Sequence, residues 1–155
     1  MKAINLKIDR TAQNKAEQFI DNIFEDFKIS DSLYGSVLMP VIELIYLVSD
    51  VKLNGIAEIE KIQLQAYVEP GKLFIEISNQ KRIDFRKAFA QIKTPGADNN
   101  QLFIINALTD DIRYSEDGDL ISMEFNMDVD KQLKFSDRGN LLKDYLRTSN
   151  KNIRV

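Results

Sequence analysis

A few carboxylates determine what chemistry this chain could perform. Glu43 is the one charged residue in the apolar run from Val37 to Val48. A buried carboxylate is costly unless it is paired or hydrogen-bonded. Glu43 is therefore predicted either to be a proton acceptor in a site or to be held by a neighbouring backbone group or a cation. Asp50, about two helical turns further on, offers an oxygen of the kind that a magnesium ion prefers.

Two residue types that dominate enzyme sites are absent, because the chain has no Cys and no His. Disulfides, thiolate nucleophiles, histidine acid–base chemistry and the usual zinc ligand sets are excluded with them. Any active site must use carboxylates, Lys, Ser, Thr or Tyr. This restriction favours a binding function over catalysis.

Basic residues gather in two places. Residues 131–155 contain seven basic side chains against two acids, a net charge of +5, whereas the whole chain has a net charge of −3 and the remainder therefore −8. This asymmetry indicates either a solvated terminal extension or a contact with an acidic partner or nucleic acid. The second cluster is Lys81, Arg82, Arg86 and Lys87, which could form a solvated surface or bind an anion.

Hydrophobic periodicity predicts the elements that must position these residues. Apolar residues alternate with polar ones in the strands and recur every three or four residues in the helices. Thr11 is the expected N-cap of the first helix, and Glu69-Pro70-Gly71-Lys72 is the expected turn of a hairpin. The predicted elements are a strand at 4–8, helices at 11–27 and 32–49, strands at 62–68 and 73–77, helices at 85–92 and 101–110, strands at 112–115 and 120–128, and a short helix at 141–147.

This order predicts an α+β fold, specifically a two-layer α/β sandwich with a mixed, mostly antiparallel sheet covered by helices on one face. We expect one domain over residues 1–128 and a basic extension over 129–155. The N-terminus lacks the apolar core of a signal peptide, and no run of apolar residues reaches the roughly 18–20 needed to span a bilayer, so a cytoplasmic location is expected.

Two stretches resemble the GHKL ATPase superfamily, which has the Bergerat fold, and in particular its anti-sigma-factor serine kinases. The first stretch, residues 101–125, reads QLFIINALTDDIRYSEDGDLISMEF: an apolar helix ending in Leu-x-Asp, a strand, a Gly turn and a final strand. The second, from Tyr34 to Glu43, is similar to the start of the family's ATP-binding helix. The resemblance implies a histidine-kinase-like ATPase fold over roughly residues 1–128.

The resemblance also implies where a nucleotide site would lie. Glu43 matches the general base of the kinase reaction, whereas Leu47 stands at the position of the magnesium-binding Asn. Asn79 stands near the Asp that reads adenine, either as a weaker adenine contact or as a turn residue. The glycine motif that wraps the phosphates falls at Asp98-Asn99-Asn100-Gln101, which carries side chains where phosphate cradles need bare backbone amides.

From these residues we expect a non-catalytic regulatory module, a pseudo-kinase that has kept the fold and binds a protein partner. The partner would be a sigma factor, an antagonist or a like subunit, with no cofactor. The alternative is an ATP-dependent serine/threonine protein kinase with an atypical pocket, which would need ATP and magnesium. A nucleic-acid contact through residues 131–155 is a weaker third reading, since interleaved aromatic residues are lacking.

Overall fold

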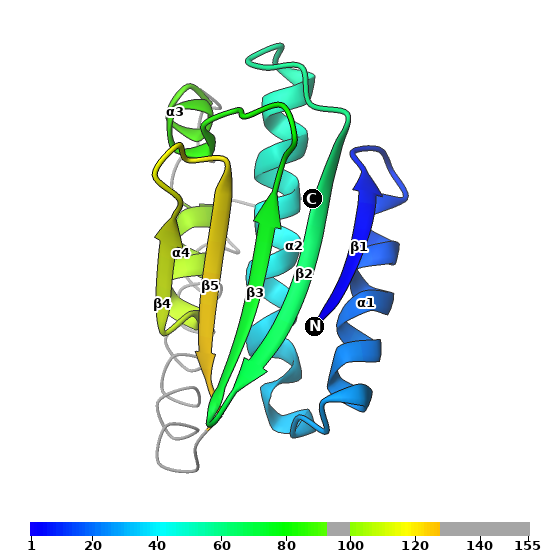
Figure 1. Cartoon of the computed structure of the whole chain (residues 1–155). Coiled ribbons are helices and arrows are strands. Elements are labelled where there is room, and N and C mark those ends of the chain that lie inside the picture. Colours follow the sequence, from blue (N-terminus) through cyan, green and yellow to red (C-terminus); the bar gives the residue numbers. More distant parts are fainter. Residues whose placement is uncertain (93–99, 128–155) are drawn as a thin grey trace, which may run out of the picture.

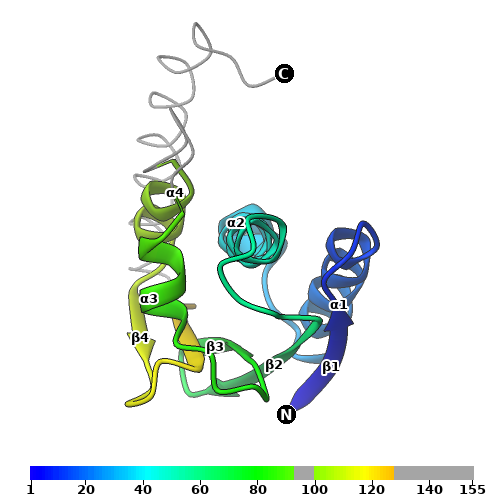
Figure 2. The same ribbon diagram turned by 90° about the horizontal axis from the view of Figure 1, so that it is seen from above.

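The chain folds into a two-layer α/β sandwich in which one layer is a five-stranded sheet and the other is helical (Figures 1 and 2). The structure is a computed structural model that describes residues 1–92 and 100–127. Its elements are β1 (Lys2–Lys7), α1 (Ala12–Asp26), a 3-10 turn (Asp31–Leu33), α2 (Tyr34–Leu53), β2 (Lys61–Glu69), β3 (Lys72–Ser78), α3 (Phe85–Ala90), α4 (Asn100–Leu108), β4 (Asp111–Tyr114) and β5 (Leu120–Asn126).

The strands lie in the order β1-β2-β3-β5-β4, and all four pairings are antiparallel. The prediction of a mostly antiparallel sheet is confirmed, and no parallel pair occurs in the described residues. The predicted hairpin is β2–β3. Pro70 and Gly71 form its turn, where the positive φ of Gly71, 76°, is one that few residues other than glycine adopt.

Alternation along the strands separates the two faces of the sheet. One face carries the fully buried Leu64, Ile75 and Phe125, which belong to one hydrophobic core with apolar residues of the helices. The other face is polar, and its side chains pair with one another across strands, as in the hydrogen bond from Gln65 to Glu76. The sheet therefore has one face in the core and one in contact with solvent.

Helix α2 lies at the centre of the helical layer, between α1 and α4 (Figure 2). It continues through Pro40 and ends at Leu53, later than predicted. By length and composition alone, the segment Asp31–Leu53 is long and apolar enough to cross a membrane. This differs from the expectation that no apolar run of this chain is long enough. Within this fold 56% of the segment's most apolar window is buried, and the core helix of a globular fold has the same properties.

Both long helices end in the same hydrogen-bonding pattern, with a left-handed residue just beyond the helix. Ile29 N–H donates to Phe24 O over 3.0 Å, and Lys28 between them has a φ of 55°. At the end of α2, Ile56 N–H donates to Val51 O over 3.0 Å across Gly55, which has a φ of 67°. These are Schellman motifs, which usually place glycine at the left-handed position.

The N-terminus of α1 differs from the prediction in one detail. Thr11 stands at the N-cap, but its side chain makes no capping hydrogen bond. Its backbone N–H and its hydroxyl both donate to Asp9 instead, over 2.8 and 2.5 Å. Asp9 thus organises the β1–α1 connection. The predicted helix at 141–147 and the basic extension at 129–155 lie outside the described residues.

Candidate functional site

Glu43 lies in the middle of α2 and is buried, with 8% of its surface exposed. Its carboxylate interacts within the molecule. One turn later, Leu47 is also buried, at 5% exposure. The position that holds a magnesium ligand in the resembled kinases is thus part of the hydrophobic core, and an alkyl side chain cannot ligate magnesium.

Asn79 follows the last residue of β3 and is likewise buried. Its side-chain Nδ2 donates to Ile83 O over 3.0 Å, and its Oδ1 accepts from Ile83 N–H over 2.9 Å. Both ends of the amide therefore close one local turn. Its backbone N–H donates to Asp119 O over 3.1 Å, which ties this turn to the β4–β5 connection.

The three remaining predicted residues are Asn99, Asn100 and Gln101. Asn99 lies outside the described residues, and Asn100 is the first residue of α4. Gln101 lines a pocket on the outer side of the helical layer, which Glu43 and Asn79 do not line. Gln101 and Asp50, which the sequence offered as a possible magnesium ligand, are the candidates among the described residues that line this cavity.

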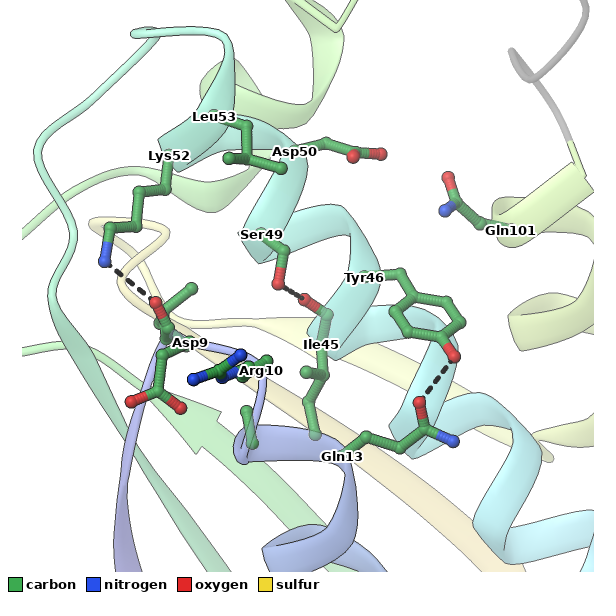
Figure 3. Close-up of a pocket in the computed structure, with 12 residues that line it drawn as sticks. Asp9, Arg10, Gln13, Ile45, Tyr46, Ser49, Asp50, Lys52, Leu53 and Gln101 are labelled. Atoms are coloured by element: carbon green, nitrogen blue, oxygen red, sulfur yellow. Dashed lines mark hydrogen bonds between the residues drawn. The ribbon is translucent and has the colours of Figure 1, made fainter.

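That pocket has a volume of about 640 Å³ and lies among the β1–α1 connection, the second half of α2 and the first turn of α4 (Figure 3). Its wall is mainly apolar and includes the side of the Tyr46 ring. The lining residues are Ile8, Asp9, Arg10, Ala12, Gln13, Ile45, Tyr46, Ser49, Asp50, Lys52, Leu53 and Gln101. We call this surface the outer groove.

Several polar groups of the outer groove are already satisfied by the fold. The Tyr46 hydroxyl donates to Gln13 Oε1 over 2.7 Å, and Ser49 Oγ donates to the Ile45 carbonyl over 2.9 Å (Figure 3). Lys52 Nζ donates to Ile8 O over 2.8 Å. Hydrogen bonds from Thr11 lower the pKa of Asp9, which keeps that carboxyl ionised. These bonds fix the shape of the groove.

Two charged side chains of the outer groove are not used in this way. Within the described residues, neither the Arg10 guanidinium nor the Asp50 carboxylate makes an ion pair or a side-chain hydrogen bond. Arg10 comes from the β1–α1 connection and Asp50 from the last turns of α2, so they belong to different walls (Figure 3). The groove therefore offers one cation and one anion to a ligand.

Large apolar side chains border the outer groove. Leu53, the last residue of α2, is 81% exposed, and Tyr46 is 37% exposed. Because these two residues are seven positions apart on a helix, they lie on one face, with Asp50 between them. The sequence alone favours a core position for Tyr46, since the run from Val37 to Val48 is apolar apart from Glu43. The seven-residue spacing of Tyr46 and Leu53 is the signal that could have indicated a surface stripe.

The basic cluster at 81–87 is partly structural. The Arg86 guanidinium lies over the Tyr114 ring at 5.5 Å, and its Nη2 donates to Glu116 O over 3.2 Å. Its Nε lies 3.5 Å from Asp84 Oδ1. Arg86 thus links α3 to the β4–β5 connection.

The described residues contain no group of three or more side chains suited to hold a metal ion. What the outer groove can do chemically is bind: it has an apolar wall, a fixed shape and two opposite charges at its rim. In comparisons with known proteins, no protein-family model matches this sequence, and no curated protein matches it.

Proposed function

We propose that this protein is a non-catalytic regulatory module that acts by binding another protein through the outer groove. The observation that carries the proposal is the groove itself, an apolar concave surface bordered by a leucine that is 81% exposed. Exposed apolar surface beside a shaped cavity is typical of protein contact sites. By its resemblance to anti-sigma-factor kinases, the partner would be a sigma factor, an antagonist or a like subunit in the cytoplasm.

The roles of Asn79 and Leu47 weigh against the alternative, an ATP-dependent serine/threonine kinase. An amide that closes a turn through both of its ends is poorly placed to read an adenine amino group as well. Phosphoryl transfer depends on metal ions to neutralise developing charge, and a buried leucine supplies no ligand for one. A protein contact needs neither feature, because function resides in sites and not in folds.

Affinity capture from a native lysate tests the proposal with three forms of the chain: wild type, Leu53→Glu in the groove and Val68→Glu on β2. Val68 is a matched control because it is also an exposed apolar residue, at 42%, and lies outside the groove. We expect one or more proteins to be retained by wild type and Val68→Glu and lost with Leu53→Glu. Equal retention by all three folded forms, or no specific retention, would contradict a contact through this groove.

A further inference from the structure

We infer that a second copy of this chain occupies the outer groove, in a two-fold dimer that places Arg10 of each copy opposite Asp50 of the other. The inference rests on the proposed function, because it takes the groove to be a protein contact, and it identifies the occupant. It depends on three observations: an apolar cavity, an exposed apolar side chain beside it, and two unused charges of opposite sign on its walls.

The apolar part of the surface is self-complementary. A two-fold interface brings the same patch of both copies together, so the patch must contain both the projection and the hollow that receives it. Leu53 is the projection, since it ends α2 and is 81% exposed. The pocket of about 640 Å³ beside it is the hollow. Removing a leucine and an apolar wall from water favours association.

The charges satisfy the same symmetry. Within the described residues the side chains of Arg10 and Asp50 make no ion pair, although both line the groove. A two-fold axis through the groove turns one cation and one anion into two reciprocal ion pairs. No residue from outside the groove is needed to complete them. Such complementarity fixes the register of an interface and excludes other partners.

The open face of the sheet is a weaker candidate for this role. Two of its ion pairs are formed within the chain: Lys72 with Glu124 at 3.5 Å, and Arg113 with Asp111 at 2.6 Å. Tyr67 stacks on Phe74 at a centroid distance of 4.9 Å, so this aromatic pair is also satisfied internally. The outer groove, in contrast, combines charges of both signs that are unpaired among the described residues with an apolar cavity and an exposed leucine.

Sedimentation velocity of the purified full-length chain over a range of concentrations tests the dimer. Wild type is expected to dimerise, and Asp50→Lys and Arg10→Asp are each expected to raise the dimer dissociation constant by about tenfold or more, because each puts like charges together. Asp117→Lys is the matched control, since Asp117 is exposed in the β4–β5 turn outside the groove, and it should dimerise like wild type. Raising the salt concentration should weaken the wild-type dimer.

Charge exchange makes the test specific. An equimolar mixture of Asp50→Lys and Arg10→Asp should form a heterodimer, and the double variant R10D/D50K should dimerise again. Dimerisation of the mixture shows that the single variants are folded, and dimerisation of the double variant shows that the two charges can be exchanged. A wild-type chain that stays monomeric, single variants that dimerise normally, or a mixture that stays monomeric would overturn the inference. If the wild-type chain is monomeric but captures a protein that the Leu53→Glu variant does not, the dimer is overturned and the proposed function still stands.

Discussion

At the scale of single residues, the hydrogen bonds and ion pairs that a polar side chain already makes determine whether it is available to a ligand. The resemblance would put Asn79 near an adenine contact, yet its amide donates to and accepts from the backbone of Ile83. Arg10 and Asp50, which no sequence motif singled out as a pair, are the charges that remain available. Sequence reasoning considered both an adenine contact and a turn for Asn79, and the hydrogen bonds show that its amide closes a turn.

Asn79→Ala should therefore destabilise the fold by about 1–3 kcal/mol, because it leaves the Ile83 N–H and carbonyl without their partners. Gln80→Ala is the control, since Gln80 is the exposed neighbour. Urea denaturation monitored by circular dichroism measures the difference. An Asn79→Ala variant as stable as wild type would show that the turn does not depend on this amide.

Tyr34 gives a prediction about pH. Its hydroxyl donates a hydrogen bond to Asp21, which, with burial and nearby acids, raises the pKa of Tyr34 to about 12. Because an unfolded tyrosine ionises near pH 10, the bond stabilises the fold fully below about pH 10, and this contribution is lost as pH rises towards 12. Tyr34→Phe should be less stable than wild type at pH 8, with the difference shrinking above pH 10.

Denaturation at a series of pH values measures this difference, and absorbance near the tyrosinate band follows the ionisation itself. Tyr46→Phe is a useful comparison, since the Tyr46 hydroxyl donates to the neutral amide of Gln13 and not to a carboxylate. If the stability difference between Tyr34→Phe and wild type were constant from pH 8 to 12, the assignment of the high pKa to the Asp21 bond would be wrong.

At the scale of elements, the two long helices end in the same hydrogen-bonding pattern but with different residues. Each ends in a Schellman motif with a left-handed residue, Lys28 after α1 and Gly55 after α2. A side chain at a left-handed position costs about 1–2 kcal/mol, whereas glycine avoids that steric cost. The end of α1 is therefore strained relative to the end of α2.

Lys28→Gly should accordingly raise the free energy of unfolding by roughly 1 kcal/mol, and Gly55→Ala should lower it by a similar amount. The space around Gly55 is open, because a Cβ placed on this residue would meet no atom within 4 Å, so backbone strain alone is being tested there. Thermal unfolding of both variants beside wild type gives the two signs. Opposite signs are required; a destabilising Lys28→Gly would contradict this account of the α1 terminus.

The elements themselves were largely predictable, because hydrophobic period and turn chemistry are local. Alternation predicted the β2–β3 hairpin, and the recurrence of Phe19, Ile20 and Ile23 predicted α1. The end of α2 was predicted too early, at about Ser49, because Asp50 and Lys52 interrupt the apolar pattern. In the fold Lys52 bonds the Ile8 carbonyl of the β1–α1 connection, a tertiary contact that no local pattern reveals.

At the scale of the whole molecule, the predicted two-layer sandwich with a mostly antiparallel sheet is confirmed. The candidate site was less predictable. Three segments that are distant in the sequence, at Arg10, Asp50 and Gln101, meet only when the helices pack side by side. Whether a charge has a partner is also a property of the folded chain. The outer groove thus could not be found before the helical layer was in place.

We propose that this chain works by protein contact and not by nucleotide chemistry, and a thermal-unfolding titration with ATP and magnesium tests this proposal most directly. A ligand at about 100 times its dissociation constant stabilises a protein by about 2.7 kcal/mol. For a domain of this size that corresponds to a shift of several degrees, roughly 5–10 °C. We predict an unchanged unfolding temperature at millimolar ATP with magnesium. A saturable rise that Asn79→Ala abolishes would contradict the claim and restore the kinase reading.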